Sequence, residues 1–273
     1  MRQMFWRRLK KSPAGMIGGG LVLFWLLVAI TAPAPYSYTA MSIEHNLASP
    51  SWAHWLGTDQ MGRDILSRII IGSRSIISIG LLVALVSTGL GTLIGFLAAY
   101  YGGRLEELIM RFMDILMSIP VVVLAMVFLG IVPKAGWGSL ILVISLVFVP
   151  RTSRVARGAL LEWKTLEFVD AAKIRGESSL YIIIREILPN TLGPILVEGT
   201  ARFSYGIMTV ASLGFLGVGL QPPTPDWGMM VAENKTIISV APWAVIFPAL
   251  SIGSLILGVF MFTDFLSRMF IRE

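Results

Sequence analysis

This sequence lacks one residue type and one nucleotide-binding motif, and it has little histidine. Its 273 residues include no cysteine, which excludes disulfides, thiolate metal sites and cysteine nucleophiles. No Gly-Lys dipeptide occurs, so the phosphate-binding loop of an ATPase is missing. The two histidines, His45 and His54, have no compact carboxylate cluster beside them. We therefore expect no metal, no bound cofactor and no enzymatic activity on this chain.

Charged residues are scarce as well, at 14% of the chain, whereas 55% is hydrophobic and the mean hydropathy is +0.78. A water-soluble domain of this length could hardly bury so much apolar surface, so the solvent must be largely lipid. Backbone polar groups must be paired within hydrocarbon, and long apolar runs then favour helices over a barrel. The sequence predicts an all-α polytopic membrane protein.

Six apolar runs approach the roughly 20 residues that cross a bilayer. They cover residues 16–34, 78–100, 113–132, 138–157, 193–218 and 242–264. The fourth run is short before Arg151, which leaves an interfacial segment as its alternative. A cleaved signal peptide is the alternative for the first run, but Pro35 is a poor residue beside a cleavage site. We expect six transmembrane helices, the first of them uncleaved.

Lysine and arginine predict how these spans are oriented. With six spans and the N-terminus inside, most of the 22 basic residues fall in inner segments, as the positive-inside rule requires. A non-crossing fourth run would instead place the most basic loop outside. We therefore expect both termini in the cytoplasm. The net charge of +6 reflects this topology, and we expect the lipid bilayer and no nucleic acid as partner.

These spans predict a simple organisation of the chain. The expected parts are a cytoplasmic N-terminal segment (1–15), a first transmembrane helix (16–34), an external loop with an amphipathic segment (35–74), a five-helix core (75–266) that contains a cytoplasmic loop (158–190), and a cytoplasmic tail (267–273).

The cytoplasmic loop carries start and stop signals for a short helix. Thr165 is a candidate N-cap, and Gly176 suits the left-handed position after the last turn. Their spacing places Phe168, Ala171 and Ala172 on one face of this helix, and the small alanine side chains would let a partner approach that face closely. A second short helix is expected from Ser178, ended by Pro189 before the next span. By itself this pattern fits either a docking surface or an amphipathic loop lying on lipid.

A family resemblance enters at the same loop. Its matching positions are Asp170, Ala171, Ala172, Gly176, Leu188 and Pro189. In spacing they resemble the EAA-xxx-G…LP signature of the membrane subunits of ABC-type importers. Asp170 replaces the usual glutamate, and Glu186 stands where the general signature has an apolar residue.

Three further motifs occur in the order expected of one branch of these importers. They are His54-Trp55-Leu56-Gly57-Thr58-Asp59-xx-Gly62-Arg63-Asp64, Arg111-xx-Asp114-xxx-Ser118-Ile119-Pro120, and Phe215-Leu216-Gly217-xx-Leu220-Gln221-Pro222-Pro223-xx-Asp226-Trp227-Gly228. They are similar to segments of the dipeptide and oligopeptide permeases of the "C" type, and with the loop they cover most of the chain beyond Trp52.

The resemblance implies a type I ABC importer permease fold and a role in binding-protein-dependent import, with di- or oligopeptides as substrate. Nickel, metallophores and oligosaccharides are alternatives within the class, and a secondary transporter is an alternative outside it. The implied partners are a homologous second permease, two cytoplasmic ATPase subunits that hold ATP and Mg, and an external binding protein. The implied location is a bacterial or archaeal cytoplasmic membrane.

The resemblance also implies a coupling role for the loop. The residues expected to contact the ATPase are Glu167, Phe168, Asp170, Ala171, Ala172, Arg175, Gly176, Leu188 and Pro189. A rigid helix joined to two spans can pass a rigid-body movement into the bundle, which a flexible loop would not.

Two further groups are candidate sites. Glu198 and Arg202 are four residues apart in the fifth span, and they either line a translocation path or form a self-contained ion pair. On the external side, the resemblance implies that four residues face the sister permease and the binding protein: Asp59, Arg63, Asp64 and Trp227. Turn formation and aromatic anchoring at the membrane surface are the alternatives for this second group.

Overall fold

The computed structural model describes residues 8–10, 12–132 and 136–270, and over these ranges the regular secondary structure is helical apart from a single isolated bridge, Thr58 to Asp64. The helices are α2 (Pro13–Thr31), α3 (Ile65–Tyr101), α4 (Gly103–Met117), α5 (Val121–Ile131), α6 (Trp137–Lys164), α7 (Glu167–Ile174), α8 (Ser179–Tyr181), the π-helix η1 (Ile182–Ile187), α9 (Leu188–Phe215), α10 (Trp227–Asn234), the 3-10 helix η2 (Lys235–Ile237) and α11 (Trp243–Phe270).

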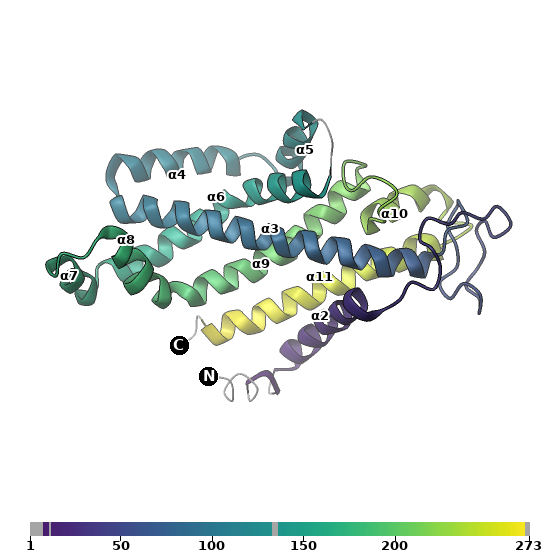
Figure 1. Cartoon of the computed structure of the whole chain (residues 1–273), viewed down its shortest axis with the longest axis horizontal. Coiled ribbons are helices and arrows are strands. Elements are labelled where there is room, and N and C mark those ends of the chain that lie inside the picture. The colour runs from purple at the N-terminus through teal and green to yellow at the C-terminus, as the bar shows by residue number, and fades with distance from the viewer. Residues whose placement is uncertain (1–7, 11, 133–135, 271–273) are drawn as a thin grey trace.

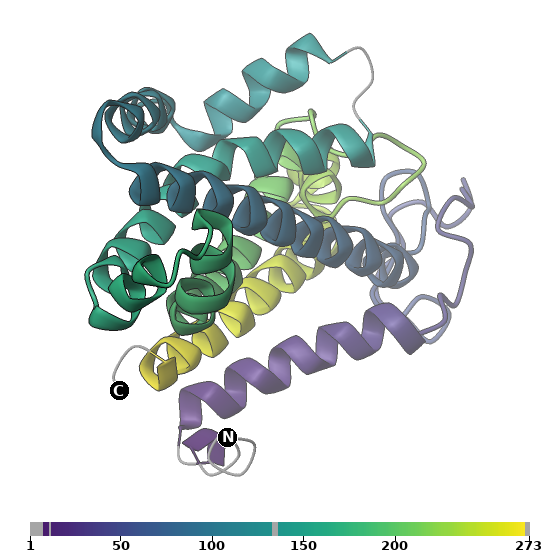
Figure 2. The same cartoon turned by 60° about the vertical axis from the view of Figure 1, so that its left-hand side comes forward.

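Five helices of the described chain are long and apolar enough to cross a membrane, and six if the bent pair α4 and α5 counts as one span. Helices α3, α6, α9 and α11 run along the long axis as a bundle, with α2 beside α11 (Figures 1 and 2). Helix α7 lies at one end, which we call the α7 end. Residues 32–64 form the other, the loop end. Helix α2 starts, and α11 finishes, on the side toward the α7 end.

Close packing of α3 on α6 depends on two glycines one turn apart. A Cβ atom on Gly91 would lie 2.5 Å from the Cβ of Thr152, and one on Gly95 would lie 2.3 Å from the carbonyl oxygen of Ser153. Both distances are too short for real atoms, so the two helices approach this closely only because the side chains are missing.

Helix α3 begins earlier than the sequence predicted. The amphipathic segment expected at the end of the external loop is helical from Ile65 and continuous with the second span. Asp64 caps this helix, because its carboxylate accepts a hydrogen bond of 2.8 Å from the backbone N–H of Ser67. The loop therefore ends at residue 64, and the first turns of α3 are largely buried.

The third span is broken, in contrast to the continuous run expected over 113–132. Helices α4 and α5 meet at 93° across Ser118-Ile119-Pro120. Proline 120 has no N–H to donate and disfavours helical geometry at the residue before it, which ends α4. Two ion pairs join the polar side of α4 to α6: Asp114 pairs with Arg154, and Glu106 pairs with Arg157.

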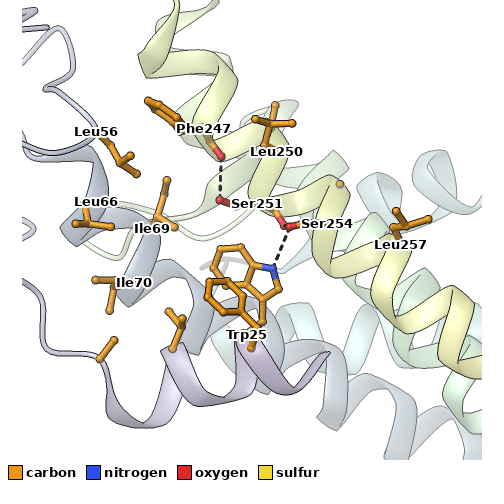
Figure 3. Close-up of a pocket in the computed structure, with 15 residues that line it drawn as sticks. Trp25, Leu56, Leu66, Ile69, Ile70, Phe247, Leu250, Ser251, Ser254 and Leu257 are labelled. Atoms are coloured by element: carbon orange, nitrogen blue, oxygen red, sulfur yellow. Dashed lines mark hydrogen bonds between the residues drawn. The ribbon is translucent and has the colours of Figure 1, made fainter. Parts of the chain in front are cut away.

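Helix α2 packs on the bundle around Trp25. The indole N–H of Trp25 donates a 3.0 Å hydrogen bond to the hydroxyl of Ser254 on α11, as Figure 3 shows. The same ring lies 4.8 Å, between centroids, from the ring of Trp227. An apolar pocket of about 630 Å³ surrounds Trp25 between α2, α3 and α11.

Candidate functional site

At the α7 end, the segment between α6 and α9, residues 165–187, is mostly helical. Helix α6 continues to Lys164, so the basic stretch that begins at Arg151 starts inside a helix and not in a loop. The N-cap prediction for Thr165 is wrong, because Thr165 closes α6 and the residue before α7 is Leu166, which caps no N–H through its side chain.

The turn that follows α7 has the predicted geometry. Gly176 has φ +78°, the left-handed conformation that glycine adopts at no steric cost. Ser178 caps the next helix, since its hydroxyl accepts a 3.3 Å hydrogen bond from the N–H of Tyr181. Both predictions are confirmed.

Pro189, in contrast, does not stop this second helix. Helices α8, η1 and α9 follow one another without a break, and Pro189 lies in the first turn of α9. The preceding turn is π-helical, with the N–H of Leu188 donating to the carbonyl of Ile183. Pro189 has no N–H to donate, and it is tolerated here because the backbone hydrogen bonds change from the π-helical to the α-helical pattern at this point. Leu188 packs on the apolar cluster of the α7 end.

Helix α7 rests on that cluster through the face that we expected to meet a partner. Val169 and Ala172 are fully buried, and the half-buried ring of Phe168 lies 6.3 Å from the ring of Trp163. Phe168 and Ala172 therefore hold α7 against the body of the protein. The prediction of one outward face made of Phe168, Ala171 and Ala172 is wrong, because only Ala171 is exposed.

The outward face of α7 contains Glu167, Asp170, Ala171 and Ile174, which the helical period places on one side. Ile174 is 87% exposed, so a large apolar side chain stands on the tip of the protein. Sequence reasoning missed this residue, although its spacing of three from Ala171 and seven from Glu167 was a usable signal. We call these four residues the α7 face.

Both residues that depart from the family signature form ion pairs. Lys173 Nζ lies 2.8 Å from Asp170 Oδ1 within α7, and Arg175 Nη2 lies 3.2 Å from Glu186 Oε1 across the turn. The second pair joins the end of α7 to the π-helix. Both pairs are partly exposed to solvent, so each adds little stability.

In the middle of α9, Arg202 is buried with 3% exposure and lies against Glu198. The Nε atom of Arg202 is 2.9 Å from Glu198 Oε1, yet its N–H has no hydrogen-bond partner among the described residues, so the contact is ionic and poorly aligned. The guanidinium also lies 4.9 Å from the ring centroid of Tyr205 and 5.2 Å from that of Phe148. The predicted one-face arrangement of the pair is confirmed.

At the loop end, Asp59 organises a buried ionic network. Its carboxylate lies 2.7 Å from Arg63 Nε and 2.5 Å from Arg68 Nη1. Glu233 on α10 completes the network, 2.7 Å from Arg63 and 3.3 Å from Arg68. Two arginines and two carboxylates therefore tie the loop to α3 and α10. No local sequence signal pointed to Glu233, since it is far from the others along the chain.

The remaining external candidates are buried as well. Asp64 is 3% exposed, and one of its carboxylate oxygens lies 2.9 Å from His54 Nδ1. Trp227 is fully buried and donates from its indole N–H to the carbonyl of Ile69 at 3.0 Å. Aromatic anchoring is therefore wrong for Trp227. In the described ranges, no group of three or more His, Asp or Glu side chains is placed to hold a metal ion.

The comparisons with known proteins agree with these motifs. Residues 91–272 match the model of the family described as binding-protein-dependent transport system inner membrane component. Residues 1–50 match the N-terminal TM domain of oligopeptide transport permease C.

Curated relatives match along nearly the whole chain. Dipeptide transport system permease protein DppC of Alkalihalophilus pseudofirmus is 37% identical over 94% of this chain and 85% of the relative. The protein of the same name from Haemophilus influenzae is 37% identical over 96% and 91%. Glutathione transport system permease protein GsiD of Pectobacterium atrosepticum is 35% identical over 95% and 87%.

Among solved structures, an inward-facing form of the MetNI methionine ABC transporter matches in fold. The TM-score is 0.62 at 18% identity, over 74% of this chain and 95% of the matched chain. The expected all-α polytopic fold of a type I importer permease is thereby confirmed. With the family model covering the chain from the second half of α3 through α11, the chain belongs to the inner-membrane components of binding-protein-dependent transport systems, and within them to the dipeptide and oligopeptide permease C type.

Proposed function

We propose that this chain is a permease subunit of an ATP-driven importer of di- or oligopeptides in a bacterial or archaeal cytoplasmic membrane. The relatives named for dipeptide and glutathione transport support the substrate class, because glutathione is itself a short peptide. The partners are a second permease, two ATPase subunits that hold ATP and Mg, and an external binding protein, as family membership implies.

The α7 end faces the cytoplasm in this proposal. The positive-inside bias supports it, and the α7 end also carries the start of α2 and the finish of α11, which fits two cytoplasmic termini. The segment 32–64 then lies outside, where the binding protein delivers substrate.

The α7 face is the coupling element, and its exposed Ile174 is the observation that carries the proposal. Transfer of this side chain into an apolar partner pocket would contribute about 1.5–3 kcal/mol to docking. Val169 and Ala172 are buried beneath helix α7, and only the short segments 165–166 and 175–178 separate it from α6 and from the continuous helices α8, η1 and α9. Closure of the ATPase subunits would thus move α6 and α9 as rigid bodies. Arg175, Gly176, Leu188 and Pro189 shape this loop and position α7.

Glu198 and Arg202 lie along the translocation path, and the 32–64 segment receives the binding protein. Asp59, Arg63, Asp64 and Trp227 act there as buried supports of that surface. Trp52 and Trp55 are 95% and 66% exposed and offer the contact area.

The coupling role is tested by Ile174→Asp in the reconstituted transporter. We expect the stimulation of ATP hydrolysis by the loaded binding protein, and peptide uptake, to fall at least tenfold, because a carboxylate cannot enter an apolar cleft without a large desolvation cost. Leu180→Asp is the matched control, since Leu180 is 64% exposed on the next helix but lies off the α7 face.

A second variant addresses the shape of the turn. Gly176→Pro cannot adopt φ +78°, so it should tilt α7 and uncouple hydrolysis from uptake while the subunits still copurify. Normal uptake in both Ile174→Asp and Gly176→Pro would refute the coupling role.

A further inference from the structure

A pocket forms where the third span breaks. It has a volume of about 280 Å³ and lies between the α4–α5 bend, α6 and α9. Its lining includes Val122, Phe148, Arg151, Arg202, Tyr205 and Met208. This volume is just below the range of about 300–1,000 Å³ for small-molecule sites, so the pocket fits one end of a peptide and not a whole one. We call it the arginine pocket.

The only charged side chains in the described lining of the arginine pocket are two guanidinium groups, Arg151 and Arg202. Glu198 offsets Arg202 alone. Arg151 is exposed, has no carboxylate within ion-pair distance among the described residues, and lies 5.8 Å from the ring centroid of Tyr205. Both guanidinium groups therefore approach one tyrosine ring, and the pocket carries an uncompensated positive charge.

Both arginines lie near the middle of their helices. Arg151 is about 21 Å along α6 from Trp137, and Arg202 about 21 Å along α9 from Leu188, at 1.5 Å per residue. Both residues also fall within the spans expected over 138–157 and 193–218, and within a span an exposed guanidinium faces a water-filled path or another protein group, and not lipid. The remaining walls are mostly apolar, with Val122, Phe148 and Met208 among them.

We propose that the arginine pocket binds the carboxylate of the transported substrate, with Arg151 as the free cation and the apolar walls receiving the side chain beside that carboxylate. A guanidinium in a site partly shielded from water pairs strongly with a carboxylate, and its planar donors fit both oxygens. This inference rests on the proposed function, because it assumes that peptides pass through this chain. The pocket would give the translocation path a preference for substrates that end in a free carboxylate.

The absence of cysteine supplies the first test. A single Met208→Cys reporter in the complete transporter, held in membrane vesicles, is labelled with methanethiosulfonates of opposite charge, sulfonatoethyl and trimethylammonioethyl. The ratio of anionic to cationic labelling rates, read on this chain, should fall roughly tenfold with Arg151→Gln, since a unit charge a few ångströms away has an effect of that order. Arg151→Lys should restore the ratio.

Arg154→Gln is the matched control, because Arg154 lies one turn further along α6 and pairs with Asp114. It should change the ratio by less than about twofold. An unchanged ratio in Arg151→Gln, or an equal fall in Arg154→Gln, would overturn the proposal.

The second test is protection by substrate. A dipeptide with a free carboxylate should slow labelling of Met208→Cys during turnover, and this protection should be lost in Arg151→Gln. Protection that persists in that variant overturns the carboxylate site. Labelling by both reagents that is slow in phosphatidylglycerol vesicles but fast in phosphatidylcholine vesicles, without peptide, shows an anionic lipid headgroup as occupant and also overturns it. ATP-driven uptake of the dipeptide is measured in the same vesicles. If the proposed function is wrong, the transporter with Arg151 unchanged shows no uptake, and this result is distinct from the labelling outcomes above.

Discussion

Two buried ionisable side chains show how single residues constrain this fold. Asp226 caps α10, where its Oδ1 accepts from the N–H groups of Gly228 and Met229 at 2.8 and 3.2 Å. Burial nevertheless raises the pKa of Asp226 to about 6, because desolvation outweighs these hydrogen bonds. Arg202, in the centre of the bundle, is instead held by a carboxylate and two aromatic rings.

Asp226 makes stability depend on pH. Its folded pKa lies above the ordinary 3.8, so its contribution is complete below about pH 4 and is lost as pH rises through about 6. We expect the melting temperature of the purified complex to fall from pH 4 to 6 relative to Asp226→Asn, which keeps an acceptor for the cap. The difference is on the order of 3 kcal/mol. Parallel melting curves for the two proteins across this range would contradict the assignment.

Removal of one partner from the Glu198–Arg202 pair should be costly. Arg202→Met leaves Glu198, whose side chain is 11% exposed, without its cation. We expect a loss of about 3–5 kcal/mol of unfolding free energy, measured by denaturation in detergent. Glu198→Gln combined with Arg202→Met should recover a large part of it, because no unpaired charge remains. A double variant no more stable than Arg202→Met would argue against a paired role.

At the scale of elements, breaks and close contacts decide what each helix does. Pro120 ends α4, and the resulting bend creates the arginine pocket. Pro150 lies inside α6 without ending it. Helix α3 is long enough to extend beyond the bilayer at both ends, and its glycines join it to α6, so the two helices form a unit that runs from the loop end to α7.

The α3–α6 contact should therefore be sensitive to one methyl group. Gly95→Ala places a Cβ 2.3 Å from the carbonyl oxygen of Ser153 and forces the helices apart, at a cost of roughly 1–3 kcal/mol. Gly89→Ala on the same helix meets nothing within 4 Å and should be neutral or stabilising by up to about 1 kcal/mol. Thermal unfolding of the two variants provides the comparison, and equal melting temperatures would contradict it.

For the whole molecule, two ends of opposite character are the main feature. The loop end is held by buried ion pairs and displays exposed tryptophans, whereas the α7 end displays one short helix over its own small apolar cluster. The bundle between them buries its core around α3, α6 and α9. Such a layout suits a protein that receives substrate at one end and a mechanical signal at the other.

Orientation can be measured with single cysteines, since the chain has none of its own. Ile43→Cys, where the native side chain is 95% exposed in the segment 32–64, should react with a membrane-impermeant maleimide in intact cells. Leu180→Cys, on the helix after α7 and off the α7 face, should react only after permeabilisation. The reverse pattern would invert the proposed topology.

Sequence alone determined the composition-driven properties of this protein. Low charge and long apolar runs required membrane helices, and the loop signature identified the family, because these signals are local along the chain. The left-handed Gly176 and the Ser178 cap were likewise readable, since each depends on its immediate neighbours. The outward position of Ile174 was encoded too, but only by helical periodicity.

Tertiary structure decided the rest, because it joins residues that are distant in sequence. Glu233 completes the network of Asp59 and Arg63 from a separate helix, which no local pattern reveals. Phe168 and Ala172 face inward because an apolar cluster lies beneath α7. Trp227 is likewise buried, but in the main core of the bundle. The arginine pocket exists only where the break at Pro120 meets α6 and α9, so proximity in space, and not the local sequence, brings Arg151 beside Arg202 and Tyr205.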